Sequence, residues 1–294
     1  MADARIALAT YSTAPTLAPD DRLLLSAIED MGIRAEPAVW SSADVNWSEF
    51  DGVVIRSCWD YHRAFDAFVT WLARLDSHAI PVWNPTPLVR WNADKRYLLD
   101  LARRGVPTIP TIVIPRGDGR RGASIASAEG WSKIVVKPTV SASGYETHAL
   151  AAPFDADAAD TIARVASMCD VLVQPFAPEV SRDGELSLVF LGGEFSHAAR
   201  KRAAPGEFRV QVEHGGSVEP TVVSGDVVEQ ASRAIAALDE IPVYARVDGI
   251  LRDGALLLME LELIEPNLFL GLRESAAERL ARIVVERLEA SRRT

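Results

Sequence analysis

The first 90 residues alternate short apolar runs with amphipathic segments, and this rhythm constrains the fold more than any other feature. Residues 5–10 (RIALAT) and 51–57 (DGVVIRS) are typical of buried strands. Residues 21–33 and 64–76 instead carry apolar side chains at helical spacing. Strands that alternate with helices in this way predict a parallel sheet of the doubly wound kind.

A group of polar and aromatic residues directly follows the second predicted strand. Ligands of doubly wound sheets bind at the carboxyl ends of the strands. We therefore expect five residues here to contact a small-molecule substrate: Arg56, Ser57, Trp59, Asp60 and Tyr61. The alternative is that Trp59 and Tyr61 pack the edge of the domain. A dinucleotide site is not expected, because no G-x-G-x-x-G motif follows the first strand and no Walker A lysine is present.

The composition indicates a globular protein with a substantial core, since 48% of the 294 residues are apolar. A net charge of −10 argues against nucleic acid as a partner, although locally gathered cations can still bind an anionic ligand. No apolar run approaches the roughly 20 residues that span a bilayer, so no membrane partner is expected. Cys58 and Cys169 form neither a disulfide framework nor a metal-ligand spacing, which favours a reduced, cytoplasmic setting.

Short strand-like runs surround a helical segment between residues 107 and 175, which predicts a small α+β unit. One of these runs, IVVK, ends at Lys137, on the same strand face as Val135. Lys137 either extends to the surface or holds phosphate oxygens beneath the small-residue loop at 138–144. Residues 115–124 (PRGDGRRGAS) are expected to form a mobile connection.

Two further segments could contact a nucleotide. Asn92 is expected to cap a helix with Lys95 in its first turn, where a cation is unfavourable unless a phosphate lies nearby. The alternative for Lys95 is a solvated surface position. Gln174, Pro175 and Phe176 end a strand and could present main-chain groups to an adenine, although a buried hydrophobe at a domain joint would give the same pattern.

The run MELEL gives the strongest chemical signal. Glu260 and Glu262 share one strand face, and two adjacent carboxylates repel each other unless a cation lies between them. Asp248 on the partner strand would complete an oxygen cage for Mg²⁺. A regular two-residue turn at 253–254 would set Asp248 opposite Met259, so the metal site requires a longer loop or a bulge. The alternative is a solvated strand face.

The preceding hairpin carries cations that could stabilise a transferring phosphoryl group. With a two-residue turn at Gly192–Gly193, Glu185 is expected to lie opposite Arg200. Lys201 follows Arg200 directly. The pair formed by Glu185 is either structural or beside a ligand.

These features, in this order, resemble the ATP-grasp superfamily of carboxylate–amine ligases, especially the branch of bacterial glutathione synthetase and the ligases that modify ribosomal protein S6. The resemblance implies a mixed α/β and α+β fold of three parts. These are an N-terminal doubly wound parallel sheet (1–90), a helix carrying Lys95 with a small ATP-lid domain (91–175), and a C-terminal antiparallel-sheet domain with the catalytic and metal residues (176–294).

The same resemblance assigns roles to the candidate residues. ATP would be bound by Lys95, Lys137, Ser141, Ser143, Gly144, Gln174, Pro175, Phe176 and Glu185. Mg²⁺, with Mn²⁺ as an alternative ion, would be held by Asp248, Glu260 and Glu262, where much of the superfamily has Asn at the last position. Catalysis would use Arg246, Arg200 and Lys201. The strings IRSCWDY, WNADKRYL, YARVDG and MELELIEPNLFL are most similar to the cyclo-ligases of D-cycloserine biosynthesis, which act on O-ureido-D-serine.

The resemblance implies that ATP converts a substrate carboxylate into an acyl phosphate, which a nitrogen of the same amino-acid-like molecule then attacks. Three alternatives are a ligase that joins two separate molecules, a non-catalytic ATP sensor, and an α/β binding protein that takes no nucleotide. The final segment, residues 274–290, is an amphipathic helix that either packs internally or joins the subunits of a homodimer.

Overall fold

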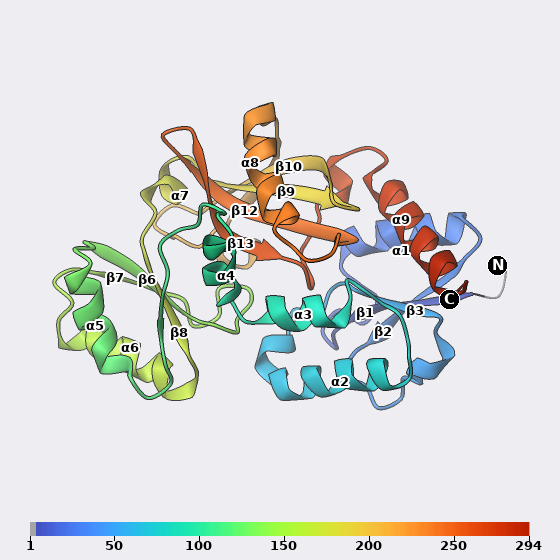
Figure 1. The fold of residues 1–294 in the computed structure, drawn as a ribbon, viewed down its shortest axis with the longest axis horizontal. Coiled ribbons are helices and arrows are strands. Elements are labelled where there is room, and N and C mark those ends of the chain that lie inside the picture. The colour runs from blue at the N-terminus through green and yellow to red at the C-terminus, as the bar shows by residue number, and fades with distance from the viewer. Residues whose placement is uncertain (1–3, 294) are drawn as a thin grey trace.

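A parallel four-stranded sheet forms the N-terminal lobe, as the sequence predicts, in a computed structural model that describes residues 4–293 (Figure 1). Its strands run in the order β2-β1-β3-β4. They are β1 (Arg5–Thr10), β2 (Arg34–Val39), β3 (Gly52–Ile55) and β4 (Val82–Trp83). The helices of this lobe are α1 (Pro19–Asp30), α2 (Phe65–Ser77) and α3 (Thr86–Ala93). The edge strand β2 carries two charged residues and an exposed proline among its six positions, so its sequence does not read as a strand.

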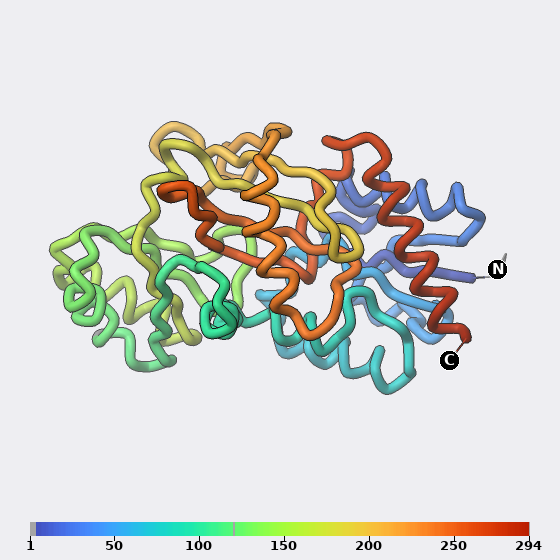
Figure 2. Tube along the Cα trace, turned by 45° about the horizontal axis from the view of Figure 1, so that its top comes forward, coloured from blue at the N-terminus to red at the C-terminus, as the bar shows by residue number. Residues whose placement is uncertain are grey.

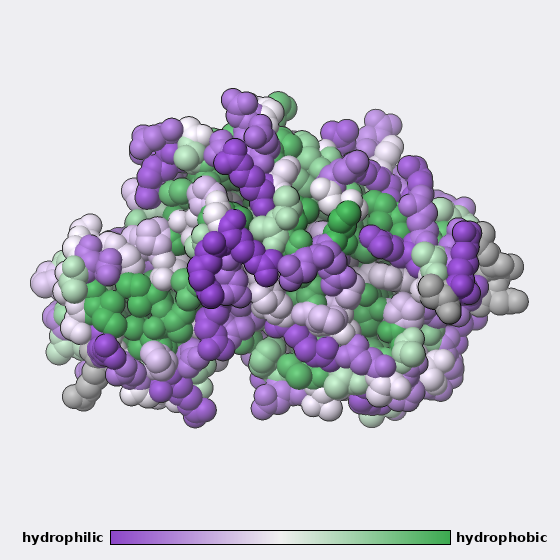
Figure 3. All heavy atoms as spheres, viewed as in Figure 1, coloured by the Kyte–Doolittle hydropathy of each residue, from purple (hydrophilic) through white to green (hydrophobic). Residues whose placement is uncertain are grey.

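The small lobe is an antiparallel sheet covered by two helices. Its strands lie in the order β5-β8-β6-β7. They are β5 (Ile112–Ile114), β6 (Lys133–Pro138), β7 (His148–Ala151) and β8 (Val171–Pro175), and the helices are α5 (Gly119–Ala128) and α6 (Ala156–Met168). In Figure 3 hydrophobic residues gather on this lobe, whereas hydrophilic residues cover much of the rest of the visible face.

The expectation of a mobile connection at residues 115–124 is wrong for its second half, because α5 begins at Gly119. Two glycines suggested a loop, but they serve close packing between helices. A Cβ atom at Gly119 would lie 2.5 Å from the Cα of Ala163 in α6, and one at Gly122 would lie 2.8 Å from Cγ2 of Ile162. Only glycine allows α5 to approach α6 this closely.

The third sheet is antiparallel and has five strands in the order β11-β10-β9-β12-β13. The strands are β9 (Glu185–Leu191), β10 (Glu194–Arg202), β11 (Ser217–Thr221), β12 (Tyr244–Arg252) and β13 (Ala255–Glu262). Helix α8 (Gly225–Ala236) buries Val227, Ala231 and Ile235 against one face of this sheet, together with α4 (Tyr97–Arg103). The short α7 (Pro178–Arg182) leads into β9.

The C-terminal helix α9 (Ala276–Ser291) returns to the N-terminal lobe and packs against α1, as Figures 1 and 2 both show. Leu280 and Val284 of α9 share a buried cluster with Leu24 and Ile28 of α1. Internal packing, the first of the two alternatives for this helix, is therefore confirmed.

Two buried side chains join the parallel sheet to the five-stranded sheet. The hydroxyl of Tyr244 donates to the carbonyl of Ile55 at 2.6 Å, at the end of β3. Asn84 accepts from the Val243 amide and donates to the carbonyls of Tyr244 and Leu263. Fully buried hydrogen bonds of this kind fix the two lobes relative to each other, and so hold the carboxyl end of β3 beside the end of β13.

Helix length and composition bear on the membrane question. Among residues 4–293, no helix is long and apolar enough to traverse a bilayer.

Candidate active site

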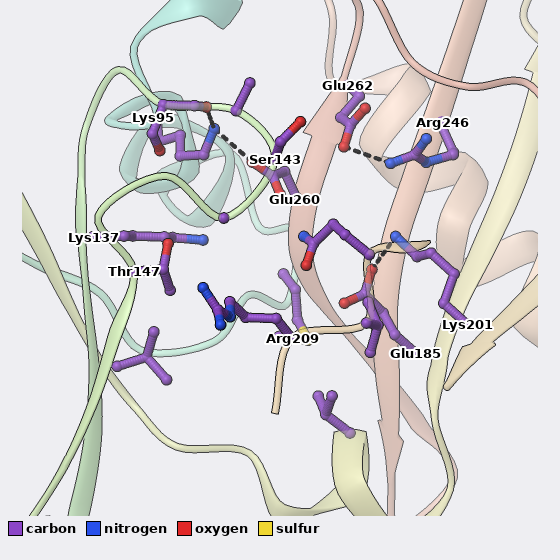
Figure 4. A pocket seen from close by; sticks show the side chains of 18 of the residues that line it. Lys95, Lys137, Ser143, Thr147, Glu185, Lys201, Arg209, Arg246, Glu260 and Glu262 are labelled. Atoms are coloured by element: carbon purple, nitrogen blue, oxygen red, sulfur yellow. Dashed lines mark hydrogen bonds and ion pairs between the residues drawn. The ribbon is translucent and has the colours of Figure 1, made fainter. Parts of the chain in front are cut away.

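A cavity of about 390 Å³ opens where the three lobes meet. Figure 4 shows its two walls, with Lys95, Lys137 and Thr147 on one side and the acidic and basic side chains of the five-stranded sheet on the other. The residues expected to bind ATP all line this cavity, namely Lys95, Lys137, Ser141, Ser143, Gly144, Gln174, Pro175, Phe176 and Glu185. Tertiary structure thus brings together side chains from several separate segments.

Lys137 lies at the end of β6 and extends into the cavity (Figure 4). Strand β6 alternates as expected, with Ile134 and Val136 in the lobe's core and Val135 and Lys137 on the cavity side. Its ammonium forms no hydrogen bond or ion pair with any residue of the described chain. Burial lowers the pKa of Lys137, and the nearby carboxylate of Glu260 opposes that effect only in part. The site therefore holds a cation that still lacks an anion.

Lys95 is positioned by a break between two helices rather than by a first helical turn. Helix α3 ends at Ala93, Asp94 is extended, and α4 begins at Tyr97, so the expected cap at Asn92 is wrong. Asn92 instead bonds the backbone of β13, donating to the Leu261 carbonyl and accepting from the Leu263 amide. The Lys95 ammonium lies 2.6 Å from Oε1 of Glu260 and donates to the Ser141 carbonyl at 2.6 Å.

The acidic hairpin contains the bulge that the metal hypothesis required. Residues 252 and 255 pair across a two-residue turn at Asp253–Gly254, yet Asp248 pairs with Glu260 because the register shifts between Asp248 and Gly249. Met259 is the extra residue. It packs at the cavity edge, and the shift brings Glu260 and Glu262 onto the same face as Arg246.

Asp248 is paired with basic side chains of the five-stranded sheet. It is 1% exposed, and its oxygens accept hydrogen bonds from Ser187, Lys201 and Arg246. Within residues 4–293 no three His, Cys, Asp or Glu side chains are grouped so as to hold a metal ion. Despite the burial that would raise it, the pKa of Asp248 is held far below its usual range by Arg246 and Lys201. In this arrangement Asp248 serves as the shared anion of Lys201 and Arg246, and a three-carboxylate cage that includes it stays a prediction.

Glu260 and Glu262 still provide a donor set that suits Mg²⁺, which in proteins typically binds one or two carboxylates together with phosphate oxygens and water. Both side chains line the cavity, opposite Lys137. Burial opposes ionisation of Glu260, but Lys95 and Lys137 outweigh it and lower its pKa to about 2. Glu262 lies 2.5 Å from Nη2 of Arg246, yet burial and two neighbouring acids raise its pKa to about 7. A divalent cation would relieve that repulsion.

A second bulge changes the partner of Glu185. The turn at Gly192–Gly193 has two residues, but the register shifts between Phe195 and His197, so Glu185 pairs with Lys201. The Lys201 ammonium lies 2.5 Å from Oε1 of Glu185 and 2.9 Å from Oδ2 of Asp248. The expected pair with Arg200 is therefore wrong. Arg200 is not among the residues that line the cavity, and it donates to the Asp183 carbonyl at 2.7 Å.

The segment after β8 forms the apolar end of the cavity. Phe176 packs between the ammonium of Lys133, 3.7 Å from its ring centre, and the ring of Phe208 at 6.4 Å. The Phe176 amide donates to the Lys133 carbonyl at 2.9 Å, so this amide is already occupied. Ile109, Val180 and Met259 also line the cavity.

The residues after β3 divide into two groups. Trp59 and Tyr61 line the cavity, in agreement with the expected contact region. Arg56, Ser57 and Asp60 do not line it, because their polar groups are used inside the lobe. Arg56 and Ser57 both bond Asp21, and Asp60 accepts from the indole of Trp40 at 2.7 Å.

Sequence reasoning missed several residues that reach the cavity. Arg209 extends into it from the loop between β10 and β11, and pairs with Glu207 at 2.7 Å (Figure 4). Thr147, Asn267 and Glu265 also line it. The position of Arg209 in a loop that joins two strands of the five-stranded sheet could have indicated that it reaches the cavity. The other positions carry no pattern that separates them from ordinary loop residues.

Comparisons with known proteins agree with this geometry. Residues 6–84 match the family model described as the N-terminal domain of the D-cycloserine synthetase DcsG. The cycloserine biosynthesis protein DcsG of Streptomyces lavendulae is 34% identical over 97% of this chain and 99% of its own length. The crystal structure of D-cycloserine synthetase DcsG superposes with a TM-score of 0.88, at 34% identity, over 97% of this chain and 99% of that one.

A more distant structure supports the fold alone. The RimK domain protein ATP-grasp from Sphaerobacter thermophilus has a TM-score of 0.69 at 22% identity, over 96% of this chain and 100% of that one. The mixed architecture of one parallel and two antiparallel sheets is thus the ATP-grasp fold. From its relationship to DcsG over nearly its whole length, the chain belongs to the DcsG family of ATP-grasp carbon–nitrogen ligases.

Proposed function

We propose that this enzyme uses Mg·ATP to activate the carboxylate of O-ureido-D-serine, or of a closely related amino acid, and then closes a ring within that molecule. The relationship to D-cycloserine synthetase over 97% of the chain supports the substrate class. The structural observation that carries the proposal is Lys137, a cation for which the described residues supply no counter-ion, beneath a loop of small residues. A cation in that setting is stabilised by an anion with several oxygens, such as a polyphosphate.

The apolar end of the cavity suits an adenine. Phe176, Val135 and Met259 offer flat or flexible apolar surfaces there. Phosphates that extend from this end would pass between Lys137 and Lys95 on one wall and Glu260 and Glu262 on the other. Mg²⁺ or Mn²⁺ bound to those two carboxylates would neutralise phosphate oxygens.

The cations of the five-stranded sheet suit phosphoryl transfer. In the proposed reaction a substrate carboxylate oxygen attacks the γ-phosphorus, and ADP leaves. Arg246 and Lys201 would stabilise the negative charge on the equatorial oxygens, because both are fixed in advance by Asp248. A substrate nitrogen then attacks the acyl carbon, loses its proton and displaces phosphate. To yield cycloserine from O-ureido-D-serine, the ureido group must also be hydrolysed, its carbonyl leaving as CO₂ and its terminal nitrogen as NH₃. Arg209, from the opposite loop, would add a further cation over the phosphates.

The test is ADP release with Mg·ATP and O-ureido-D-serine, with the product mass measured in the same reaction. ADP together with cycloserine is the expected result. ADP formation that requires a second amino acid or amine would contradict ring closure and favour an intermolecular ligase. Binding of Mg·ATP without ADP release over a broad amino-acid panel would contradict the ligase proposal altogether and favour a sensor.

Variants assign that turnover to the cavity. Lys137→Met should abolish it, whereas Arg121→Met, which removes an exposed cation on α5 of the same lobe, should leave it unchanged. Near-normal turnover in Lys137→Met would contradict the phosphate role.

A further inference from the structure

Glu265 and Tyr61 are two polar side chains of the cavity to which the proposed binding of ATP and Mg²⁺ assigns no role. Tyr61 is 3% exposed and lines the cavity, and its hydroxyl makes no hydrogen bond to any residue between 4 and 293. The Glu265 carboxylate also lines the cavity, and apart from its own backbone amide it has no partner within the same residues. Neither group has a side-chain partner among residues 4–293, so both are available to a ligand atom that enters the cavity.

The backbone beside Glu265 is held from the N-terminal lobe. The indole of Trp59 donates to the Glu265 carbonyl at 3.0 Å. The next carbonyl, that of Pro266, accepts from Nη2 of Arg56 at 2.6 Å. Arg56 is itself fixed by Asp21 at 2.8 Å. A carboxylate whose backbone is held on two sides is positioned before any ligand arrives, which lowers the entropic cost of binding.

The charges around the cavity indicate that the ligand group bound by Glu265 is a cation. Three cavity carboxylates already have cations within 2.6 Å, since Glu185 pairs with Lys201, Glu260 with Lys95, and Glu262 with Arg246. Glu265 has no such cation among the described residues, and burial, reinforced by the charge of Glu262, raises its pKa to about 8. Of the charged groups near Tyr61, Glu265 adds most to the effect of burial in raising the pKa of that phenol.

We propose that Glu265 and Tyr61 form the subsite for the protonated amine of the amino-acid substrate, the carboxylate binding the ammonium and the phenol oxygen accepting one of its hydrogens. This inference rests on the proposed function and names the group that selects an amino acid. The substrate's own geometry agrees with it, because an α-amine lies two bonds from the carboxyl carbon. Arg246, Glu262 and Glu265 line the same cavity, and the charge of Glu262 is close enough to add to the effect of burial in raising the pKa of Glu265. A carboxylate held at Arg246 therefore places its amine on the side of Glu265.

The subsite selects for the charge of the ligand group and favours a cation. An ammonium at this place forms an ion pair that stabilises the ionised form of Glu265 against the burial that raises its pKa, whereas a neutral or anionic group forms no such pair. Trp59 adds an aromatic wall on the same side of the cavity. The enzyme is thereby expected to reject hydroxy acids and deaminated acids that carry the same carboxylate.

The test compares O-ureido-D-serine with the analogue in which a hydrogen replaces the amine, in the wild-type enzyme, Glu265→Gln and Tyr61→Phe. Glu265→Gln should lower kcat/KM for the amino substrate about 30-fold to 150-fold, mainly through KM, because one charge-assisted bond of about 2–3 kcal/mol is lost. For the deaminated analogue, kcat/KM should change less than about threefold. Tyr61→Phe should lower kcat/KM about fivefold to 10-fold, in the same direction.

Two controls isolate the contribution of the subsite. Glu274→Gln, which changes an exposed carboxylate outside the cavity, should behave as wild type. The affinity of all variants for Mg·ATP should be unchanged, which excludes a general loss of folding. An unchanged preference for the amine in Glu265→Gln, or a loss confined to kcat, would overturn the proposal.

Failure of the proposed function would be recognised separately. Calorimetric titration of O-ureido-D-serine into the enzyme with a non-hydrolysable ATP analogue requires no turnover. An affinity about 30-fold weaker in Glu265→Gln would support the subsite even if the wild-type enzyme released no ADP. Equal affinities would reject the subsite while ADP release in the wild type still supported the ligase.

Discussion

Lys95 and Lys137 enter the same cavity, yet removing their charges should have opposite effects on stability. Lys95 forms an ion pair of 2.6 Å with Glu260, and its ammonium also bonds the Ser141 carbonyl. Lys137 has no such partner among residues 4–293. Substitution of each by Met keeps most of the apolar stem and removes only the charge.

The magnitude for Lys95→Met follows from the geometry. At 2.6 Å and an effective dielectric constant near 20, the Coulomb attraction to Glu260 is ~6 kcal/mol before desolvation is subtracted. Loss of one partner of a buried pair typically costs ~3–5 kcal/mol. The side chain of Glu260 is 23% exposed and Lys137 remains nearby, so the lower end of that range, about 3 kcal/mol, is expected.

Lys137→Met should not lower the free energy of unfolding, in contrast to Lys95→Met. The pKa of Lys137 is lowered in the folded state, so at neutral pH the protonated group opposes folding. This penalty begins to fall as the pH rises past the folded-state pKa and is gone above the ordinary pKa of lysine. The variant should therefore unfold with a free energy equal to, or up to about 1 kcal/mol above, that of the wild type. The pKa of Lys95 is raised by Glu260 against the effect of burial, so its stabilisation is present below its ordinary pKa and is lost above it.

Urea denaturation at pH 7, followed by tryptophan fluorescence, measures both effects without any ligand. Mg·ATP titration on the same samples provides the functional readout, in which Lys137→Met should bind ATP about 10-fold to 150-fold more weakly through loss of one charged hydrogen bond of about 1.5–3 kcal/mol. The reasoning is refuted if Lys137→Met is destabilised as much as Lys95→Met, since Lys137 would then have a structural partner.

Three further outcomes are expected. Asp248→Asn leaves Lys201 and Arg246 without their shared anion and should lower the free energy of unfolding by about 3–5 kcal/mol. In the same urea denaturation, the matched Asp253→Asn in the exposed turn of this hairpin should change that free energy by less than about 0.5 kcal/mol. Equal effects of the two substitutions would contradict the role of Asp248. His62 has neither ring nitrogen bonded within the described chain, and burial lowers its pKa to about 4, so the unfolded chain binds more protons between pH 6.5 and 4 and stability falls on acidification through that window. His62→Phe should remove at most about 3 kcal/mol of that loss, and parallel stability–pH curves for the two proteins would argue against it. Gly119→Ala should lower the melting temperature by crowding Ala163, at a cost of about 1–3 kcal/mol, while Gly225→Ala, where a Cβ meets no atom within 4 Å, should be neutral or slightly stabilising in the same scan.

Much of the site could be predicted because its signals are local. The alternation of β6 determines that Lys137 faces away from the lobe's core, and MELEL determines that Glu260 and Glu262 share a face. The order of these segments along the chain then indicated the superfamily. The small-residue loop and the end of β8 were likewise visible as breaks in apolar strands.

The error in the partner of Glu185 has its physical origin in β-sheet register. One extra residue in a strand reverses which side chains face the partner. The bulge between Phe195 and His197 gives Glu185 the partner Lys201 instead of Arg200. No feature of the sequence EFSHAARK predicts this bulge. Asp248 was correctly placed on its strand and Arg56 directly after β3, but the buried partner of each lies far away in the chain, at Lys201, 47 positions from Asp248, and at Asp21, 35 positions from Arg56.

The sequence by itself determined the elements and their chemistry: a parallel N-terminal sheet, a lysine closing a buried strand, and paired carboxylates on one face, because each follows from periodicity within a few residues. Only the tertiary structure decided which charged groups are paired within the protein and which remain available to a ligand. Asp248 pairs with Lys201 and Arg246, and Glu260 pairs with Lys95. The polar groups of Lys137, Glu265 and Tyr61 line the cavity without a side-chain partner among the described residues. The reason is that ion pairing acts through space over a few ångströms, between side chains that can be far apart in the chain, as are Lys95 and Glu260, which are 165 positions apart.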